Sequence, residues 1–307
     1  MNSRLSRVCR PASCFINSAT IDILFKLIAM TFLIRWLSNL SLPRMQKIGW
    51  LLGWVTWALS PRYKKQFREQ SHQAGYNFAQ VRAAVGAAGC QALESFRVWF
   101  GAPMPVQWEG AVHITQAFER GKGVLFMTPH LGCFEITAPS FSQRFGEAHG
   151  AMTVLYRPAR QAWLRQLLVH AREKPHLKAV PASMDGVRQL LKALRRGHSV
   201  GLLPDQVPPD GMGMWSSMWG RPAYTMTLGA KLAMQTGARI VLAWGERLPG
   251  GKGYCIHVEP MHEELSEDLE TAVLQINKAM EGLIRQCPEQ YLWGYARFKR
   301  PRHEELA

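Results

Sequence analysis

The sequence predicts a single α/β domain built on a mostly parallel sheet that helices flank on both faces. After Pro105, short runs of strand-forming residues alternate with amphipathic stretches of helical length, a pattern typical of parallel sheets with crossover helices. The 307 residues suffice for one large domain with a well-buried core. No internal repeat or low-complexity segment points to another architecture.

The elements follow from local composition. Residues 62–100 are Ala-rich and amphipathic, which predicts helices. Apolar runs rich in strand formers predict strands at residues 123–127, 152–156, 177–180, 199–203, 239–244 and 254–258. Helical periodicity predicts helices at residues 133–145, 161–172, 184–196, 225–235 and 268–286.

Positive charge is concentrated near the N-terminus. The net charge is +15, and residues 1–70 hold eleven Lys and Arg against only Asp22 and Glu69. These basic residues are interleaved with the most apolar stretches, which favours an anionic membrane surface as partner. A nucleic-acid module would show a recognisable reading motif, and none is present, so we expect no nucleic-acid partner. An evenly solvated basic surface is the alternative.

Two apolar segments predict membrane association of residues 30–60. Charges interrupt residues 21–40, while residues 48–59 carry no charge and contain Trp50, Trp54 and Trp57. Twelve helical residues reach only about 18 Å, less than the roughly 30 Å of a hydrocarbon core. We therefore expect an embedded or interfacial helical hairpin; a single tilted span through residues 21–40, or tryptophans that simply pack in a core, are the alternatives.

Three regions result from this division of the chain. Residues 1–29 are expected to be a basic, poorly ordered extension, residues 30–60 the membrane-associated segment, and residues 61–307 the α/β domain. The six cysteines show neither a CxxC motif nor metal-ligand spacing, so we expect no disulfide framework, no metal site and a reducing compartment.

The first candidate for chemistry is His130, which follows the predicted buried strand at residues 123–127. Glu135 comes five residues later, and Gly132 between them allows the backbone to bend so that both side chains face one cleft. A carboxylate that accepts from one ring nitrogen fixes the tautomer and leaves the other nitrogen free to take a proton. We expect His130 as general base and Glu135 as its orienting partner; a histidine that is merely hydrogen-bonded in the core is the alternative.

Two further candidates follow other predicted strands. Arg157 comes directly after residues 152–156, and its guanidinium is suited to grip a phosphate. Asp205 follows the strand at residues 199–203. Sites of open α/β sheets lie beyond the carboxyl ends of the strands, so these residues are candidates for substrate binding. Arg157 could instead cap a surface strand.

Six short motifs occur in a fixed order along the chain: HLGCFE from residue 130, YRP from 156, GLLPDQ from 201, GRPA from 220, PEQYLW from 288 and RFK from 297. Because these motifs occur together in this order, the chain resembles the late acyltransferases of lipid A biosynthesis. These are the lauroyl and myristoyl transferases, within the lysophospholipid acyltransferase superfamily. HLGCFE is similar to the H-x4-D/E box of that superfamily. Two places depart from the pattern: Cys133 and Phe134 replace the common Asn and Trp, and Val207 and Pro208 follow the DQ pair.

The resemblance implies an O-acyltransferase on the cytoplasmic face of the inner membrane. It would move a fatty acyl group from acyl carrier protein, or from coenzyme A, to a hydroxyl of a 3-hydroxyacyl chain on an anionic lipid A precursor. His130 would be the general base, Glu135 its partner, and Arg157 and Asp205 would shape substrate binding. A thioester is already activated, so no metal or redox cofactor is expected. The apolar residues 207–222 would wall an acyl-chain groove, dip into lipid or pack under the sheet.

Three other functions stay open at this point. The enzyme could acylate a different lysolipid, such as a glycerolipid or an ornithine lipid. It could be a metal-dependent hydrolase that uses His130 and Glu135 with His149, His170 or His176, although no HExxH motif is present. It could also be a catalytically silent membrane-binding module.

Overall fold

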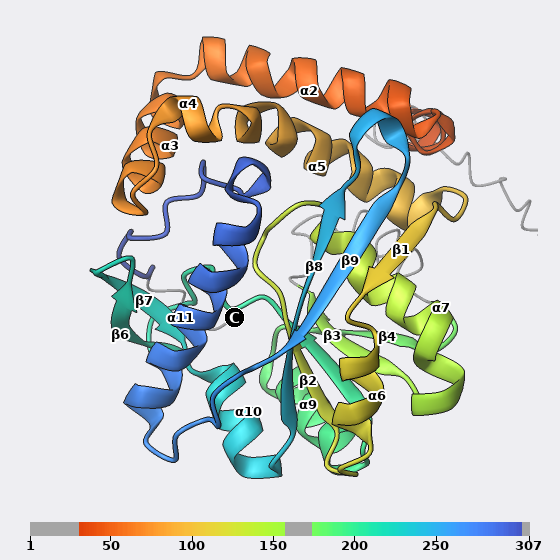
Figure 1. Ribbon diagram of the computed structural model, residues 1–307, viewed down its shortest axis with the longest axis vertical. Helices are drawn as coiled ribbons and strands as arrows, with labels where there is room; N and C mark the ends of the chain where they lie inside the picture. Colours follow the sequence, from red (N-terminus) through yellow and green to blue (C-terminus); the bar gives the residue numbers. More distant parts are fainter. Residues whose placement is uncertain (1–30, 157–173, 303–307) are drawn as a thin grey trace, which may run out of the picture.

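The computed structural model describes residues 31–156 and 174–302, and its centre is a seven-stranded sheet (Figure 1). The strand order is β1-β9-β8-β2-β5-β3-β4. Strands β8, β2, β5, β3 and β4 are mutually parallel, while β9 runs antiparallel to β8 and β1 runs parallel to β9. These strands are β1 (Val106–Glu109), β2 (Val124–Met127), β3 (Met152–Tyr156), β4 (Leu177–Pro181), β5 (Ser199–Leu202), β8 (Arg239–Arg247) and β9 (Tyr254–Pro260). The prediction of a mostly parallel sheet between helices is confirmed.

The helices cover both faces of this sheet and one of its ends. They are α2 (Leu42–Leu59), α3 (Pro61–Gln73), α4 (Phe78–Val81), α5 (Ala83–Phe100), α6 (Val112–Phe118), α7 (Thr137–His149), α9 (Met184–Arg195), α10 (Leu228–Thr236) and α11 (Leu269–Gln286), and residues 31–39 are also helical. Helices α2 and α5 pack against each other and cover the end of the sheet where the hairpin of β8 and β9 extends beyond the other strands (Figure 1).

Strand β2 is buried on both faces because alternate side chains enter two different cores. Leu125 and Met127 pack with residues of α9, α10 and α11, whereas Val124 and Phe126 pack with residues of α6 and α7. This explains why the sequence of β2 is an unbroken apolar run. This burial also holds the carboxyl end of β2, and the residues that follow it, in a rigid position.

Helix boundaries follow ordinary capping chemistry. Ser183 accepts a hydrogen bond from the amide of Gly186 at the start of α9, and Asp268 accepts one from Thr271 at the start of α11. Gly237, with φ of 67°, ends α10 in the left-handed conformation. Helices α9 and α11 begin and end within one residue of their predicted positions, and α10 begins three residues later than predicted.

The structure differs from the sequence prediction in several elements. Strand β1 and helix α6 precede the first predicted strand, and residues predicted as an apolar loop form the hairpin β6 (Gly213–Met218) and β7 (Arg221–Met226). Met218 is fully buried in the core, which agrees with packing under the sheet, while Trp215 and Met212 are about half exposed. The helix predicted at residues 161–172 and the extension at 1–29 lie outside the described residues.

Helix α2 carries small residues toward α5 and large apolar residues toward solvent. A Cβ atom added at Gly53 would lie 2.2 Å from the carbonyl oxygen of Val85, and one at Gly89 would lie 2.0 Å from that of Gly49, so the two backbones are in close contact. The opposite face exposes Ile48, Leu51, Leu52, Val55 and Leu59, and the helix at residues 31–39 exposes Phe32, Leu33 and Trp36.

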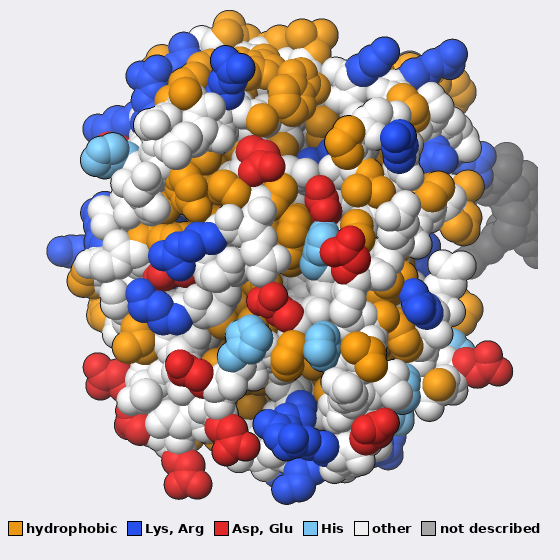
Figure 2. All heavy atoms as spheres, in the orientation of Figure 1, with side chains coloured by type: hydrophobic (Ala, Val, Ile, Leu, Met, Phe, Trp, Pro, Cys, Tyr) orange, Lys and Arg blue, Asp and Glu red, His pale blue; other side chains and the backbone are white. Residues whose placement is uncertain are grey.

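This outward face is apolar and bordered by positive charge. Figure 2 shows hydrophobic side chains gathered over α2, with Lys and Arg side chains on either side. Residues 31–68 contain seven Lys and Arg and no acidic residue. Within the described part of the chain, no helix is both long enough and apolar enough to cross a membrane.

Candidate functional site

The site is built on β2 and β5, which are neighbours in the sheet and run parallel. Their carboxyl ends therefore lie side by side at one edge, and the loop after each strand begins there. His130 is in the loop after β2, and Asp205 is in the loop after β5. Sheet topology thus brings together two residues that are 75 positions apart in the sequence.

Asp205 holds His130 through two hydrogen bonds. The Nδ1 atom of His130 lies 2.7 Å from Oδ1 of Asp205, and the backbone N–H of His130 donates to Oδ2 at 2.8 Å. The side chain of Asp205 is 2 % exposed and that of His130 is 15 % exposed. The carboxylate therefore fixes both the backbone and the ring of the histidine, while the ring keeps access to solvent.

The second ring nitrogen faces Gln206. The amide nitrogen of Gln206 lies 3.0 Å from Nε2 of His130. Because the carboxylate of Asp205 can only accept, Nδ1 carries the proton and Nε2 presents a lone pair, to which the Gln206 amide donates. This is the tautomer that a general base needs at Nε2.

A second layer of residues surrounds the carboxylate of Asp205. The hydroxyl of Tyr291 donates to Oδ2 at 3.3 Å, and the buried guanidinium of Arg297 lies close enough to interact electrostatically. Burial alone would raise the pKa of Asp205, but the charge and hydrogen bonds of His130, with help from Arg297, lower it below the ordinary value. Arg297 itself is anchored by hydrogen bonds to the Tyr224 carbonyl at 2.7 Å and to Thr225 Oγ1 at 2.6 Å.

The loop that carries His130 is fixed from behind by the segment after α11. The N–H of Leu292 donates to the His130 carbonyl at 3.2 Å, and Leu131 forms a bridge with Tyr291. Gly132 has φ of 61°, and a Cβ atom there would lie 2.0 Å from the Gly245 carbonyl oxygen. The bend expected at Gly132 is therefore present, and only glycine fits it.

Glu135 lies in the short 3-10 helix η1 (Phe134–Ile136) and interacts with α5. Its Oε2 atom accepts a hydrogen bond from the indole N–H of Trp99 at 2.8 Å. The structure thus places Asp205, rather than Glu135, at Nδ1 of His130, where the sequence led us to expect Glu135. Between the two residues of the box, the ring of Phe134 packs against His130 with centroids 4.6 Å apart.

The remaining sequence candidate is Arg157, and Cys133 is a box residue that departs from the family pattern. Arg157 lies outside the described residues. Cys133 is 1 % exposed, and burial raises its pKa well above the ordinary value. It is therefore a protonated packing residue at neutral pH and is unsuited to act as a nucleophile.

Four residues of this site were not assigned a role from the sequence: Gln206, Tyr291, Arg297 and Tyr295, whose hydroxyl accepts from the Val207 amide at 2.9 Å. Each belongs to a short motif noted in the sequence, GLLPDQ, PEQYLW or RFK, or lies between two of them. The only sign in the sequence that these residues belong to the site was that they are polar and lie in or between these motifs. Their roles depend on contacts with residues far along the chain, which the motifs do not specify.

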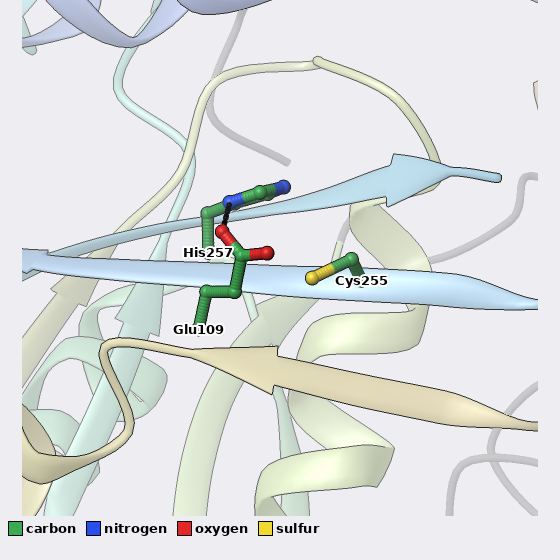
Figure 3. Close-up of side chains that lie close together, drawn as sticks. All are labelled: Glu109, Cys255 and His257. Carbon is green, nitrogen blue, oxygen red and sulfur yellow. Dashed lines mark ion pairs between the residues drawn. The ribbon is translucent and has the colours of Figure 1, made fainter.

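A second histidine lies on the face of the sheet formed by β1, β8 and β9. Nδ1 of His257 is 3.1 Å from Glu109, and Nε2 is 2.8 Å from Glu246. Figure 3 shows Glu109 and Cys255 pointing toward the same place, and among the described residues these two with His257 form the one group of three possible metal ligands. Because Nε2 of His257 is hydrogen-bonded to Glu246 and Nδ1 lies at ion-pair distance from Glu109, the arrangement is explained without an ion.

The model of the family described as "Bacterial lipid A biosynthesis acyltransferase" matches residues 73–300. The chain is 27 % identical over 221 residues to a lipid A biosynthesis lauroyltransferase of Escherichia coli, with 69 % of each chain covered. It is 24 % identical over 236 residues to a palmitoleoyltransferase of the same pathway and organism, with 74 % of each covered. A lipid A biosynthesis acyltransferase of Haemophilus influenzae is 25 % identical over 235 residues, covering 76 % of this chain and 70 % of the relative.

Proposed function

Because the chain belongs to the bacterial lipid A biosynthesis acyltransferase family, we propose that it transfers a fatty acyl group from acyl carrier protein to the hydroxyl of a 3-hydroxyacyl chain on a lipid A precursor. The chain is an O-acyltransferase. The observation that carries the more detailed proposal is the contact of 2.7 Å between His130 and Asp205, with Nε2 turned toward the amide of Gln206.

In the proposed reaction His130 is the general base. A substrate hydroxyl takes the place of the Gln206 amide at Nε2 and gives up its proton as its oxygen attacks the thioester carbonyl. The C–S bond then breaks, and the departing thiolate receives the proton from the imidazolium. Asp205 orients the ring and stabilises its positive charge during this step. Atoms and charge balance without a redox or metal cofactor.

The other residues of the box receive supporting roles in this proposal. Glu135 supports the turn after His130 through its hydrogen bond from Trp99. Arg157 grips a phosphate of the acceptor lipid or of the carrier group, because a guanidinium binds phosphate in a bidentate manner. The net charge of +15 favours encounter with both an acidic carrier protein and an anionic acceptor.

One assay tests this function. Purified protein is incubated with a phosphorylated lipid A precursor and a panel of acyl carrier proteins and acyl coenzyme A thioesters, and the products are weighed by mass spectrometry. We expect one added acyl chain from acyl carrier protein and none with H130A. Acylation of a glycerolipid or ornithine lysolipid instead of the lipid A precursor would contradict the proposed acceptor, and transfer from coenzyme A alone would contradict the proposed donor.

We further propose that the outward face of α2 binds the cytoplasmic side of the inner membrane. Large exposed apolar side chains bordered by basic residues are suited to an anionic lipid surface. The acceptor is itself a membrane lipid, and the four described cysteines are free and buried, as expected in a reducing compartment.

Vesicle binding tests this second proposal. Leu51 and Leu59 are 64 % and 78 % exposed, so L51S/L59S should fold normally. We expect at least tenfold weaker binding to vesicles of phosphatidylethanolamine and phosphatidylglycerol, because burial of each leucine is worth about 1.5–3 kcal/mol. M184S removes a similarly exposed side chain on α9 and should bind as the wild type does. Unchanged binding by L51S/L59S would exclude this face.

A further inference from the structure

A buried ion pair lies behind the loop that carries His130. Glu94 of α5 is 0 % exposed and Arg247, at the end of β8, is 9 % exposed. The guanidinium binds the carboxylate through two contacts, Nε to Oε1 at 2.7 Å and Nη2 to Oε2 at 2.6 Å. Burial would lower the pKa of Arg247, but Glu94 outweighs burial and raises it. Arg247 is therefore charged in the interior, with the buried carboxylate of Glu94 as its bidentate partner.

Stability alone does not explain such a pair. The desolvation of two charges offsets most of their attraction, so that apolar residues of similar volume often stabilise a protein equally well or better. What apolar residues do not supply is direction, because a guanidinium and a carboxylate fix each other's orientation through paired hydrogen bonds. The pair must be understood through the groups that it orients.

Those groups belong to the loop of His130. Nη2 of Arg247 approaches the carbonyl oxygen of Gly132 at 3.5 Å. The backbone N–H of Arg247 donates to the side-chain oxygen of Gln290 at 2.9 Å, and the Gln290 amide donates to the Arg247 carbonyl at 3.1 Å. The backbone carbonyl of Gln290 in turn accepts from the N–H of Gly132 at 3.1 Å. Gly132 is thus held on both its N–H and its C=O, two residues after His130.

The other side of the pair is fixed by α2. The side-chain amide of Gln46 donates to Oε1 of Glu94 at 3.0 Å. Glu94 therefore lies between α2 on one side and Arg247 on the other, and cannot turn without loss of several bonds. The chain of contacts from Gln46 through Glu94, Arg247 and Gln290 to Gly132 is continuous in the structure.

We propose that Glu94 and Arg247 are positioning residues for acyl transfer, which set the loop of His130 so that its ring meets both Asp205 and the substrate hydroxyl. The proposal rests on the proposed function of His130. The ion pair touches neither the imidazole of His130 nor the carboxylate of Asp205. In this proposal it nevertheless controls the rate of the chemical step. Misplacement by about 1 Å is enough to slow an oriented reaction about a hundredfold.

The decisive variant is E94L/R247M, which replaces both charges by apolar side chains of similar volume. We expect a melting temperature close to that of the wild type, kcat lowered by about ten- to a hundredfold, and KM changed less than kcat. R247K should recover only part of the loss, because a lysine lacks the planar fork. R285M is the control: it removes an arginine that pairs with buried Glu281 at 3.4 Å on α11, and should keep the wild-type kcat.

Wild-type kcat in folded E94L/R247M would overturn the proposal. If the double variant does not fold, R247K and Q290A decide: a folded variant with lowered kcat supports the proposal, and one with unchanged kcat overturns it. A readout independent of activity is the downfield proton NMR signal of the His130 Nδ1–H bonded to Asp205. We expect this signal to shift or vanish in E94L/R247M and to remain in R285M; an unshifted signal counts against the proposal. A wild-type protein that transfers no acyl group contradicts the proposed function, and the NMR result still decides the positioning role.

Discussion

Both ring nitrogens of His130 and of His257 have polar neighbours, but the neighbours differ in kind. At His257 both partners, Glu109 and Glu246, are carboxylates, which only accept hydrogen bonds. At His130 one partner is the carboxylate of Asp205 and the other is the amide of Gln206, which can donate. Nε2 of His257 therefore faces an acceptor, Glu246, at 2.8 Å, whereas Nε2 of His130 faces a donor and keeps its lone pair.

Burial separates the two histidines as well. Asp205 is 2 % exposed, whereas the side chains of Glu109 and Glu246 are 70 % and 31 % exposed. An interaction with a buried carboxylate is screened little by solvent, and one with an exposed carboxylate is screened strongly. The comparison teaches that a carboxylate next to a histidine does not make a base; a free nitrogen and a rigid, dry partner are also needed.

The largest expected effect is that of H130A. Removal of a general base typically lowers the rate by about 10²–10⁴-fold, and we expect a fall in kcat of that size with little change in melting temperature. The measurement is the rate of acyl transfer to a lipid A precursor by folded protein. H257Q is the matched control, since it removes the histidine that lacks a free nitrogen, and should retain activity.

The comparison fails if these two variants behave alike. Equal loss of activity in both would mean that the damage arises from the fold rather than from the base. Full activity in H130A would remove His130 from the mechanism altogether. In that case the other carboxylate of the box, Glu135, would become the group to test next.

The next largest effect is expected for D205N. Asparagine has nearly the same shape, but its amide nitrogen replaces one of the two oxygens that accept from the ring and the backbone of His130. The ring loses its fixed tautomer, and we expect kcat to fall strongly but by less than in H130A, because the orienting carboxylate of a triad contributes less than its histidine. A smaller loss in D205N than in E135Q would show that Glu135, not Asp205, is the more important carboxylate.

The stability of the wild type and that of D205N should also respond differently to acid. The pKa of Asp205 is lowered in the folded protein, so its stabilising effect is complete above the ordinary value of about 4 and is lost as pH falls through the lower folded value. We expect the gap in melting temperature between the wild type and D205N to be widest at neutral pH and to narrow below about pH 4. A gap that is constant with pH would show that Asp205 does not act through its charge.

Much of the fold could be predicted because its signals are local. The apolar run of β2 and the turn after it identified His130, and the end of β5 identified Asp205. The pairing of the two could not be predicted, because it depends on β2 and β5 being neighbours in the sheet. A local partner, Glu135, was expected instead.

The missed hairpin has a different cause. Its turn is formed by Trp219 and Gly220, with φ of 53° and 73°. Two consecutive positive φ values are normally signalled by Asn-Gly or Asp-Gly, and tryptophan in the first position gives no such signal. The amide of Trp219 is bonded to the buried carboxylate of Glu281 at 2.6 Å, which is 62 residues away. Tertiary structure therefore stabilises a turn that the local sequence disfavours.

The smallest expected effect concerns Gln206, which distinguishes His130 from His257 most directly. In the proposed reaction the substrate hydroxyl replaces the Gln206 amide at Nε2, so this amide is present in the free enzyme and absent at the moment of transfer. Q206A should therefore change kcat by less than about tenfold. Q206E is the sharper test: a carboxylate at this position would give His130 the two acceptors that His257 has, Nε2 would be held as a donor, and kcat should fall well below that of Q206A. Equal rates in Q206A and Q206E would show that the donor character of this neighbour does not matter and that the contrast between the two histidines lies in burial alone.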